Sequence, residues 1–151
     1  MSRQPVGGLL LWIQLGALAL QALLTGMALQ VIDAPPDWAL GCIAAGALLG
    51  LWALSVNRPG NFNFRPEPKA DGRLVTHGPY RWIRHPMYAG LLLISAGLGG
   101  IIDSFHGWML SLTLLGALLI KASFEDRWMA QAHPEYADYM AHTRGFVPFI
   151  Y

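Results

Sequence analysis

Residues 6–32 read VGGLLLWIQLGALALQALLTGMALQVI and contain no charged side chain. About 20 apolar residues in a helix that rises 1.5 Å per residue cross the bilayer core of about 30 Å. The stretch is longer than the apolar region of a secretory signal, and it has no convincing small-residue cleavage site. It therefore predicts a retained transmembrane helix.

Three further apolar stretches follow, and the first of them opens after a turn at Ala34–Asp37 and contains the spacing Gly46-x-x-x-Gly50. Small residues four apart permit close helix packing in a membrane. We expect an all-α integral membrane bundle of four transmembrane helices, which forms a single domain over residues 1–151. The predicted spans cover residues 6–32, 38–56, 87–102 and 105–124.

The composition agrees with a membrane protein. The 151 residues are 54% hydrophobic and 13% charged, whereas a soluble domain carries about 25% charged residues. The net charge is +1 and no long basic stripe exists, which argues against a nucleic-acid partner. Cys42 is the single cysteine, so an intramolecular disulfide is excluded. Nothing in the sequence defines the oligomeric state.

The basic residues indicate the orientation of the bundle. A four-span topology puts all ten on one side and leaves only Asp33, Asp37 and Asp103 on the other. Because positive loops stay inside, we expect both termini and the long connection in the cytoplasm. The basic residues are Arg3, Arg58, Arg65, Lys69, Arg73, Arg81, Arg84, Lys121, Arg127 and Arg144.

Two polar segments border the last two predicted spans. Residues 57–86 are rich in proline and glycine and are predicted to form a loop, and residues 125–151 are predicted to form a cap that contains an amphipathic helix. The apolar residues of that helix would be Phe124, Trp128, Ala132, Tyr136, Tyr139 and Met140. Spans joined by a short turn are antiparallel neighbours, so ionisable residues of both segments meet at one end of the bundle. Such a cluster is a candidate functional site.

Simpler roles are open for the same residues. Arg81 and Arg84 are suited to bind lipid phosphates, and His85 is placed to cap the third span. Glu125 lies four residues after Lys121 and suits an ion pair along one helix face. The histidines show no spacing typical of a metal site, so no metal is expected.

The sequence from Arg84 to Tyr88 reads Arg-His-Pro-Met-Tyr, and a hydrophobic stretch and the acidic pair Glu125–Asp126 follow it. The closing segments Pro134–Tyr139 and Arg144–Phe149 complete the pattern. This constellation resembles the isoprenylcysteine carboxyl methyltransferase family and its phospholipid methyltransferase relatives. The resemblance covers about half of the chain, from Gly72 to the end.

The resemblance implies an integral membrane enzyme that uses S-adenosylmethionine (SAM). It implies catalytic roles for Lys121 and Glu125, with Lys121 standing where the family tends to have an arginine near the methyl acceptor. A lysine keeps the charge but loses bidentate carboxylate recognition. The residues that the resemblance assigns to cofactor binding are Arg73, Leu74, Val75, Tyr80, His85, Pro86, Met87, Tyr88 and Glu125.

The expected activity is methyl transfer to a lipophilic small molecule or lipid that reaches the enzyme from the bilayer. The acceptor atom is a carboxylate oxygen, an amine nitrogen or a thiol sulfur. Transfer from a sulfonium depends mainly on positioning and desolvation. A short four-span chain suggests a prokaryotic inner-membrane enzyme. The alternatives are an NADPH-dependent membrane reductase of the sterol-reductase type and a non-enzymatic lipid-binding protein.

Overall fold

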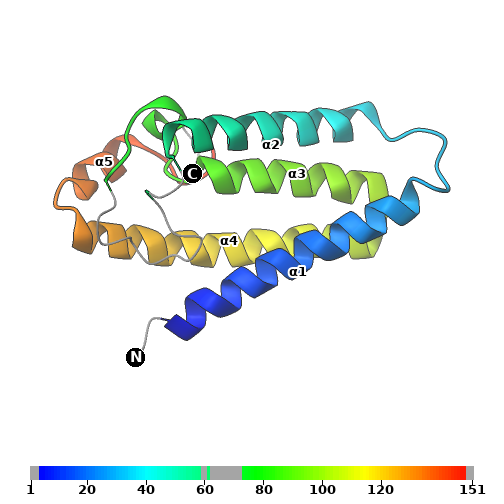
Figure 1. Cartoon of the computed structure of the whole chain (residues 1–151), viewed down its shortest axis with the longest axis horizontal. Coiled ribbons are helices and arrows are strands. Elements are labelled where there is room, and N and C mark those ends of the chain that lie inside the picture. The colour runs from blue at the N-terminus through cyan, green and yellow to red at the C-terminus, as the bar shows by residue number, and fades with distance from the viewer. Residues whose placement is uncertain (1–3, 59–60, 62–72, 149–151) are drawn as a thin grey trace.

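The computed structural model describes residues 4–58, 61 and 73–148, and all regular elements in this part of the chain are helices (Figure 1). The expected all-α class is therefore confirmed. The long helices are α1 (Gln4–Ala28), α2 (Asp37–Val56), α3 (Pro86–Ile102) and α4 (Phe105–Ala132), and the short ones are the 3-10 helix η1 (Gly78–Arg81) and α5 (Tyr136–His142).

Three of the long helices, α1 from Val6, α2 and α4, are long and apolar enough to cross a membrane. Helix α3 has 17 residues, about 26 Å at 1.5 Å per residue, which is short for the bilayer core. It contacts each of the other three long helices. In Figure 1, α2, α3 and α4 run side by side, and α1 crosses them at an angle.

Two helix ends differ from the sequence prediction. Helix α1 ends at Ala28, four residues before the predicted end of the first span. Helix α4 continues to Ala132, so the prediction that residues after Phe124 begin a separate amphipathic helix is wrong. The extended backbone of His133 (φ −127°, ψ 108°) ends α4, because the residue before a proline disfavours the helical region. Among the described residues beyond this break, α5 is the one helix of the cap.

Glycines let α2 and α3 approach closely. A Cβ atom added at Gly46 would lie 2.5 Å from the carbonyl oxygen of Gly90, and one added at Gly97 would collide with the carbonyl oxygen of Ala39. Gly50, the other member of the predicted glycine pair, would meet nothing within 4 Å. The backbone of Gly50 still adjoins α3, because a Cβ atom added at Gly90 would lie 3.2 Å from Gly50 N. Both glycines of the spacing therefore belong to the contact between α2 and α3, and Gly50 also lines a cavity.

A buried polar network joins α1 to α3 and α4. The Gln21 amide nitrogen lies 2.9 Å from Ser111 Oγ and 3.2 Å from the Ser95 carbonyl oxygen, and Ser95 Oγ donates to Gln21 Oε1 at 2.8 Å. Gln21 and Ser95 are completely buried. Because an unpaired amide in hydrocarbon is costly, this network fixes the register of α1 against its neighbours.

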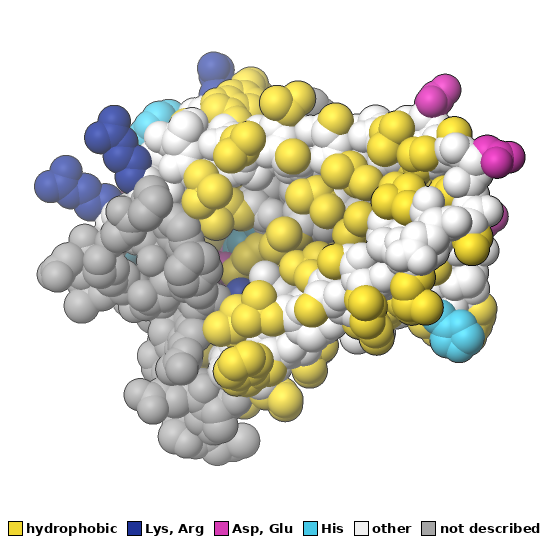
Figure 2. All heavy atoms as spheres, turned by 45° about the vertical axis from the view of Figure 1, so that its right-hand side comes forward, with side chains coloured by type: hydrophobic (Ala, Val, Ile, Leu, Met, Phe, Trp, Pro, Cys, Tyr) yellow, Lys and Arg dark blue, Asp and Glu magenta, His cyan; other side chains and the backbone are white. Residues whose placement is uncertain are grey.

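Charge separates along the bundle. On the face in Figure 2, lysine and arginine side chains gather at one end and aspartate or glutamate side chains at the other, and further charged side chains are visible in the hollow between the two ends. We call the end with the lysine and arginine side chains the basic end. The described connection before α3 (residues 73–85) and helix α5 lie there, and the short connections between α1 and α2 and between α3 and α4 lie at the opposite end (Figure 1).

We predict that Gly46→Ala lowers the melting temperature of the detergent-purified protein, because its methyl group collides with the α3 backbone. Overpacking of this kind typically costs about 1–3 kcal/mol. Gly41→Ala is the matched control in the same helix, where the methyl group meets nothing within 4 Å. An equal melting temperature for Gly46→Ala and the wild type would contradict the close contact.

Candidate active site

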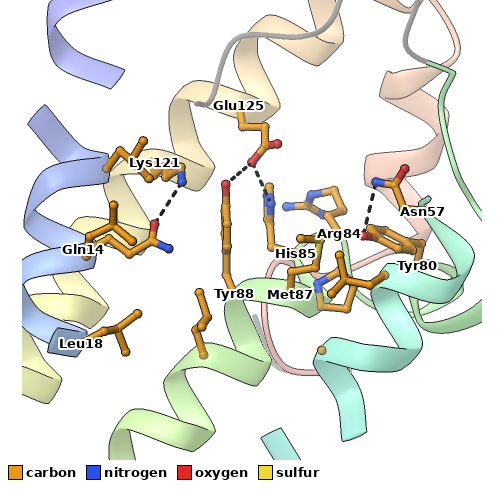
Figure 3. Close-up of a pocket in the computed structure, with 16 residues that line it drawn as sticks. Gln14, Leu18, Asn57, Tyr80, Arg84, His85, Met87, Tyr88, Lys121 and Glu125 are labelled. Carbon is orange, nitrogen blue, oxygen red and sulfur yellow. Dashed lines mark hydrogen bonds and ion pairs between the residues drawn. The ribbon is translucent and has the colours of Figure 1, made fainter. Parts of the chain in front are cut away.

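A cavity of about 380 Å³ opens at the basic end of the bundle, and side chains from all four long helices line it (Figure 3). Its volume lies within the range of about 300–1,000 Å³ that is typical of small-molecule sites. The lining residues are Leu11, Gln14, Leu15, Leu18, Gly50, Leu54, Asn57, Tyr80, Arg84, His85, Pro86, Met87, Tyr88, Leu91, Lys121 and Glu125.

Seven of the ten site residues named from the sequence line this cavity, namely Tyr80, His85, Pro86, Met87, Tyr88, Lys121 and Glu125. The other three, Arg73, Leu74 and Val75, are not part of its described lining. The Arg73 backbone instead binds Asn61 through both its N–H and its carbonyl group, at 2.7 and 2.9 Å.

His85 lies between two carboxylates. Its Nε2 atom is 3.0 Å from Asp126 Oδ1, and its Nδ1 atom is 3.5 Å from Glu125 Oε2. A neutral imidazole donates from only one nitrogen, so two facing carboxylates favour the protonated ring. Burial lowers the pKa of His85, but the hydrogen bonds to Asp126 and Glu125 outweigh it and raise that pKa from 6.5 to about 9.

The two carboxylates face different surroundings. Glu125 lines the cavity, whereas Asp126 lies behind His85 and outside the cavity lining. Asp126 accepts a hydrogen bond from Tyr136 at 2.5 Å and binds Arg84 Nε through both oxygens, at 3.2 and 3.3 Å. Asp126 therefore anchors His85 from behind, while Glu125 is available to a ligand.

The C-terminal segment fixes the backbone that carries His85. The His85 N–H donates to the Gly145 carbonyl oxygen at 3.0 Å, and the Arg84 N–H donates to the Arg144 carbonyl oxygen at 2.7 Å. The ring of Phe146 packs against the imidazole, with 5.6 Å between centroids. This pairing holds the segment before α3 in one position without a sheet.

Tyr88 connects the two catalytic candidates. Its hydroxyl donates to Glu125 Oε2 at 2.9 Å, and its ring stacks on His85 with 5.4 Å between centroids. The Lys121 Nζ atom lies 5.1 Å from the Tyr88 ring centroid and donates to Gln14 Oε1 at 3.0 Å. The described contacts of Glu125 are thus with Tyr88 and His85, not the helix-face ion pair with Lys121.

Polar groups of the connection form the wall nearest the basic end. Asn57 donates to the Tyr80 hydroxyl at 3.4 Å, and Tyr139 donates to the Tyr80 carbonyl oxygen at 2.7 Å. Burial, opposed in part by this Asn57 hydrogen bond, raises the pKa of Tyr80. The phenol therefore stays protonated and provides a neutral aromatic surface.

Sequence reasoning did not assign Gln14, Asn57 or the leucines of α1 and α2 to the site. The only signal for Gln14 was its polarity within an apolar span, which Gln21 shares. The simpler roles of two residues also differ in the structure: Arg84 binds Asp126, and the side chain of His85 makes no capping hydrogen bond. Among residues 4–58, 61 and 73–148, no group of three or more histidine, cysteine, aspartate or glutamate side chains is arranged to hold a metal ion.

We predict that stability depends on the charge of His85. Because its pKa is raised in the folded state, the contribution is complete below pH 6.5 and is lost as the pH rises through about 9. The loss amounts to about 3 kcal/mol at most. Melting temperatures between pH 6 and 10 should fall for the wild type and change less for His85→Gln. Parallel curves for the two proteins would contradict this role.

Comparison with known proteins links the site to a family. The family model for phospholipid methyltransferases matches residues 37–136, which include α2, α3 and α4. The cobalt-zinc-cadmium resistance protein CzcN of Cupriavidus metallidurans is 40% identical over 82 residues, which are 53% of this chain and 38% of CzcN.

A second relative matches along nearly all of the chain. The nickel-cobalt-cadmium resistance protein NccN of Alcaligenes xylosoxydans xylosoxydans is 29% identical over 150 residues, which are 98% of this chain and 66% of NccN. The chain therefore spans less than two thirds of the length of each of these relatives.

Proposed function

The chain belongs to the phospholipid methyltransferase family, a group of membrane methyltransferases, and we propose that it uses SAM to methylate an amphiphile from the bilayer. The observation that carries the proposal is the cavity in which Tyr80, His85, Tyr88, Lys121 and Glu125 converge. These residues come from the segments that carry the family resemblance. Family membership favours this activity over a reductase or a lipid-binding role.

The chemistry of the cavity fits SAM. Glu125 presents a carboxylate beside the aromatic ring of Tyr88, and both groups attract a sulfonium cation. Tyr80 and Asn57 offer an aromatic surface and an amide for a nucleoside at the polar wall. When bound, SAM supplies an electrophilic methyl group, whose C–S bond breaks with the electron pair staying on sulfur while a lone pair of the acceptor forms the new bond.

The residues of the chain then act by positioning and charge. The Tyr88 hydroxyl fixes one Glu125 oxygen, and the His85 imidazolium offsets the charge of two neighbouring carboxylates. An acceptor that is already an anion needs no proton removal, so no general base is required. Catalysis then comes from alignment of the two reactants and exclusion of water.

Apolar walls support access of the acceptor from the bilayer. Leu11, Leu15 and Leu18 of α1 face the cavity, and Leu54 of α2 lines it as well. Figure 2 shows a hollow in this face, with hydrophobic side chains around it and charged side chains at its base. An acceptor with an apolar tail can approach the methyl group from the side without crossing the polar wall.

The basic end of the bundle supports a cytoplasmic location for the site. Basic residues mark the inner side of membrane proteins, and SAM is a cytoplasmic metabolite. Both relatives come from bacteria, which supports placement in a bacterial inner membrane.

We predict that Glu125→Gln lowers the affinity for SAM at least about tenfold, because it removes the charge beside the sulfonium and weakens the Tyr88 contact. Calorimetric titration of SAM and of its demethylated product into the purified protein checks this. Glu135→Gln is the matched control, with an exposed carboxylate. Absence of saturable binding to the folded wild type would overturn the proposed function.

A further inference from the structure

Helix α1 contributes a polar residue to the cavity although it lies outside the matched family region, which begins at residue 37. Gln14 is 9% exposed, and Leu11, Leu15 and Leu18 flank it in the cavity wall. An uncompensated carboxamide in a transmembrane helix is costly. Such residues mark functional sites in membrane proteins more often than elsewhere.

The two ends of the Gln14 amide face different surroundings: the oxygen faces Lys121 and the nitrogen faces the cavity. Its oxygen accepts from Lys121 Nζ at 3.0 Å, an orientation required because an ammonium only donates. Within the described part of the chain, the hydrogen bond from Lys121 is the one that the Gln14 side chain makes, and its amide nitrogen has no acceptor there. Figure 3 shows this nitrogen turned away from Lys121, toward the space beside Tyr88.

Gln21 lies seven residues, or about two turns, further along α1, and its hydrogen bonding differs from that of Gln14. Both ends of its amide are bonded, to Ser95 and Ser111, and it is completely buried. The two glutamines therefore differ in how far their side-chain hydrogen bonds are satisfied within the bundle. Gln21 satisfies its hydrogen bonds within the bundle, whereas Gln14 retains a donor that points into a ligand-sized space.

We propose that Gln14 is a specificity-determining residue, whose amide positions the Lys121 ammonium and joins it in a donor pair that holds the polar head of the methyl acceptor. This inference rests on the proposed function. The pair offers only hydrogen-bond donors to a ligand, because the amide oxygen is occupied by Lys121. It selects an amphiphile with an anionic, hydrogen-bond-accepting head over one with an ammonium head.

The location of the pair favours the acceptor over SAM as its ligand. Lys121 precedes Glu125 by four residues of α4, which places it about 6 Å further from the basic end. The wall around Gln14 is made of leucines, which suit an alkyl tail and not the zwitterionic end of SAM. The polar wall at Tyr80 and Asn57 lies nearer the connection.

The test measures binding and needs no turnover. Octanoate and octylammonium, matched in chain length, are titrated calorimetrically into nanodisc-embedded protein, with empty nanodiscs as the reference, and SAM is titrated separately. The variants are Gln14→Leu and Gln14→Glu, which lacks the amide donor and adds a negative charge. Gln30→Leu, an exposed glutamine beyond the end of α1, is the control. Melting temperatures establish that each variant is folded.

The wild type and Gln30→Leu should bind octanoate at least about tenfold more tightly than octylammonium. Gln14→Leu should weaken octanoate binding about tenfold and leave SAM affinity unchanged, and Gln14→Glu should reverse the preference between the two amphiphiles. Equal affinity of the wild type for both amphiphiles would overturn the inference. So would a Gln14→Leu variant that loses SAM binding but keeps octanoate binding.

The two proposals fail separately in this design. A wild type that selects octanoate through Gln14 but binds no SAM would overturn the proposed function and leave the head-group pair standing. A wild type that binds SAM and shows no Gln14-dependent preference would overturn only the pair.

Discussion

The buried imidazolium of His85 between Glu125 and Asp126 is the interaction on which the site depends. It links the residue before α3 to the turns of α4 at the basic end of the bundle, with contacts of 3.5 and 3.0 Å. Each carboxylate alone would be costly in a half-buried position. With the shared cation between them, one carboxylate anchors the ring to Arg84 and Tyr136, and the other remains at the cavity wall.

The rest of the fold positions this contact. Close packing of α2 on α3 at Gly46 and Gly90 sets one wall of the cavity, and the Gln21 network fixes α1 at the other side. The pairing of the C-terminal segment with the backbone at His85 completes the frame. A short chain therefore builds a site from all of its long helices, and changes in helix packing are expected to reach the cavity.

The lengths of the apolar stretches and the polar, proline-containing segments between them predicted the four long helices. Membrane spans are predictable in this way because they are encoded by composition over about 20 residues. The motif from Arg84 to Tyr88 and the acidic pair at Glu125 predicted six of the sixteen residues that line the cavity, and these include the buried histidine and the carboxylate at its wall. Helix ends and single contacts were not predictable. The change from apolar to polar residues after Phe124 does not end α4, which continues to Ala132. The contact of Gln14 with Lys121 joins two residues that are 107 positions apart in the sequence.

The account is tested most directly by methyl transfer in a bilayer. Protein reconstituted into liposomes with lipid extracted from a bacterial inner membrane is incubated with methyl-labelled SAM, and the label is followed into organic solvent. Label that enters an extractable amphiphile only with wild-type protein, and not with His85→Gln, is the predicted result. Label that stays wholly water-soluble, from folded protein that binds SAM, would contradict transfer to a membrane-borne acceptor.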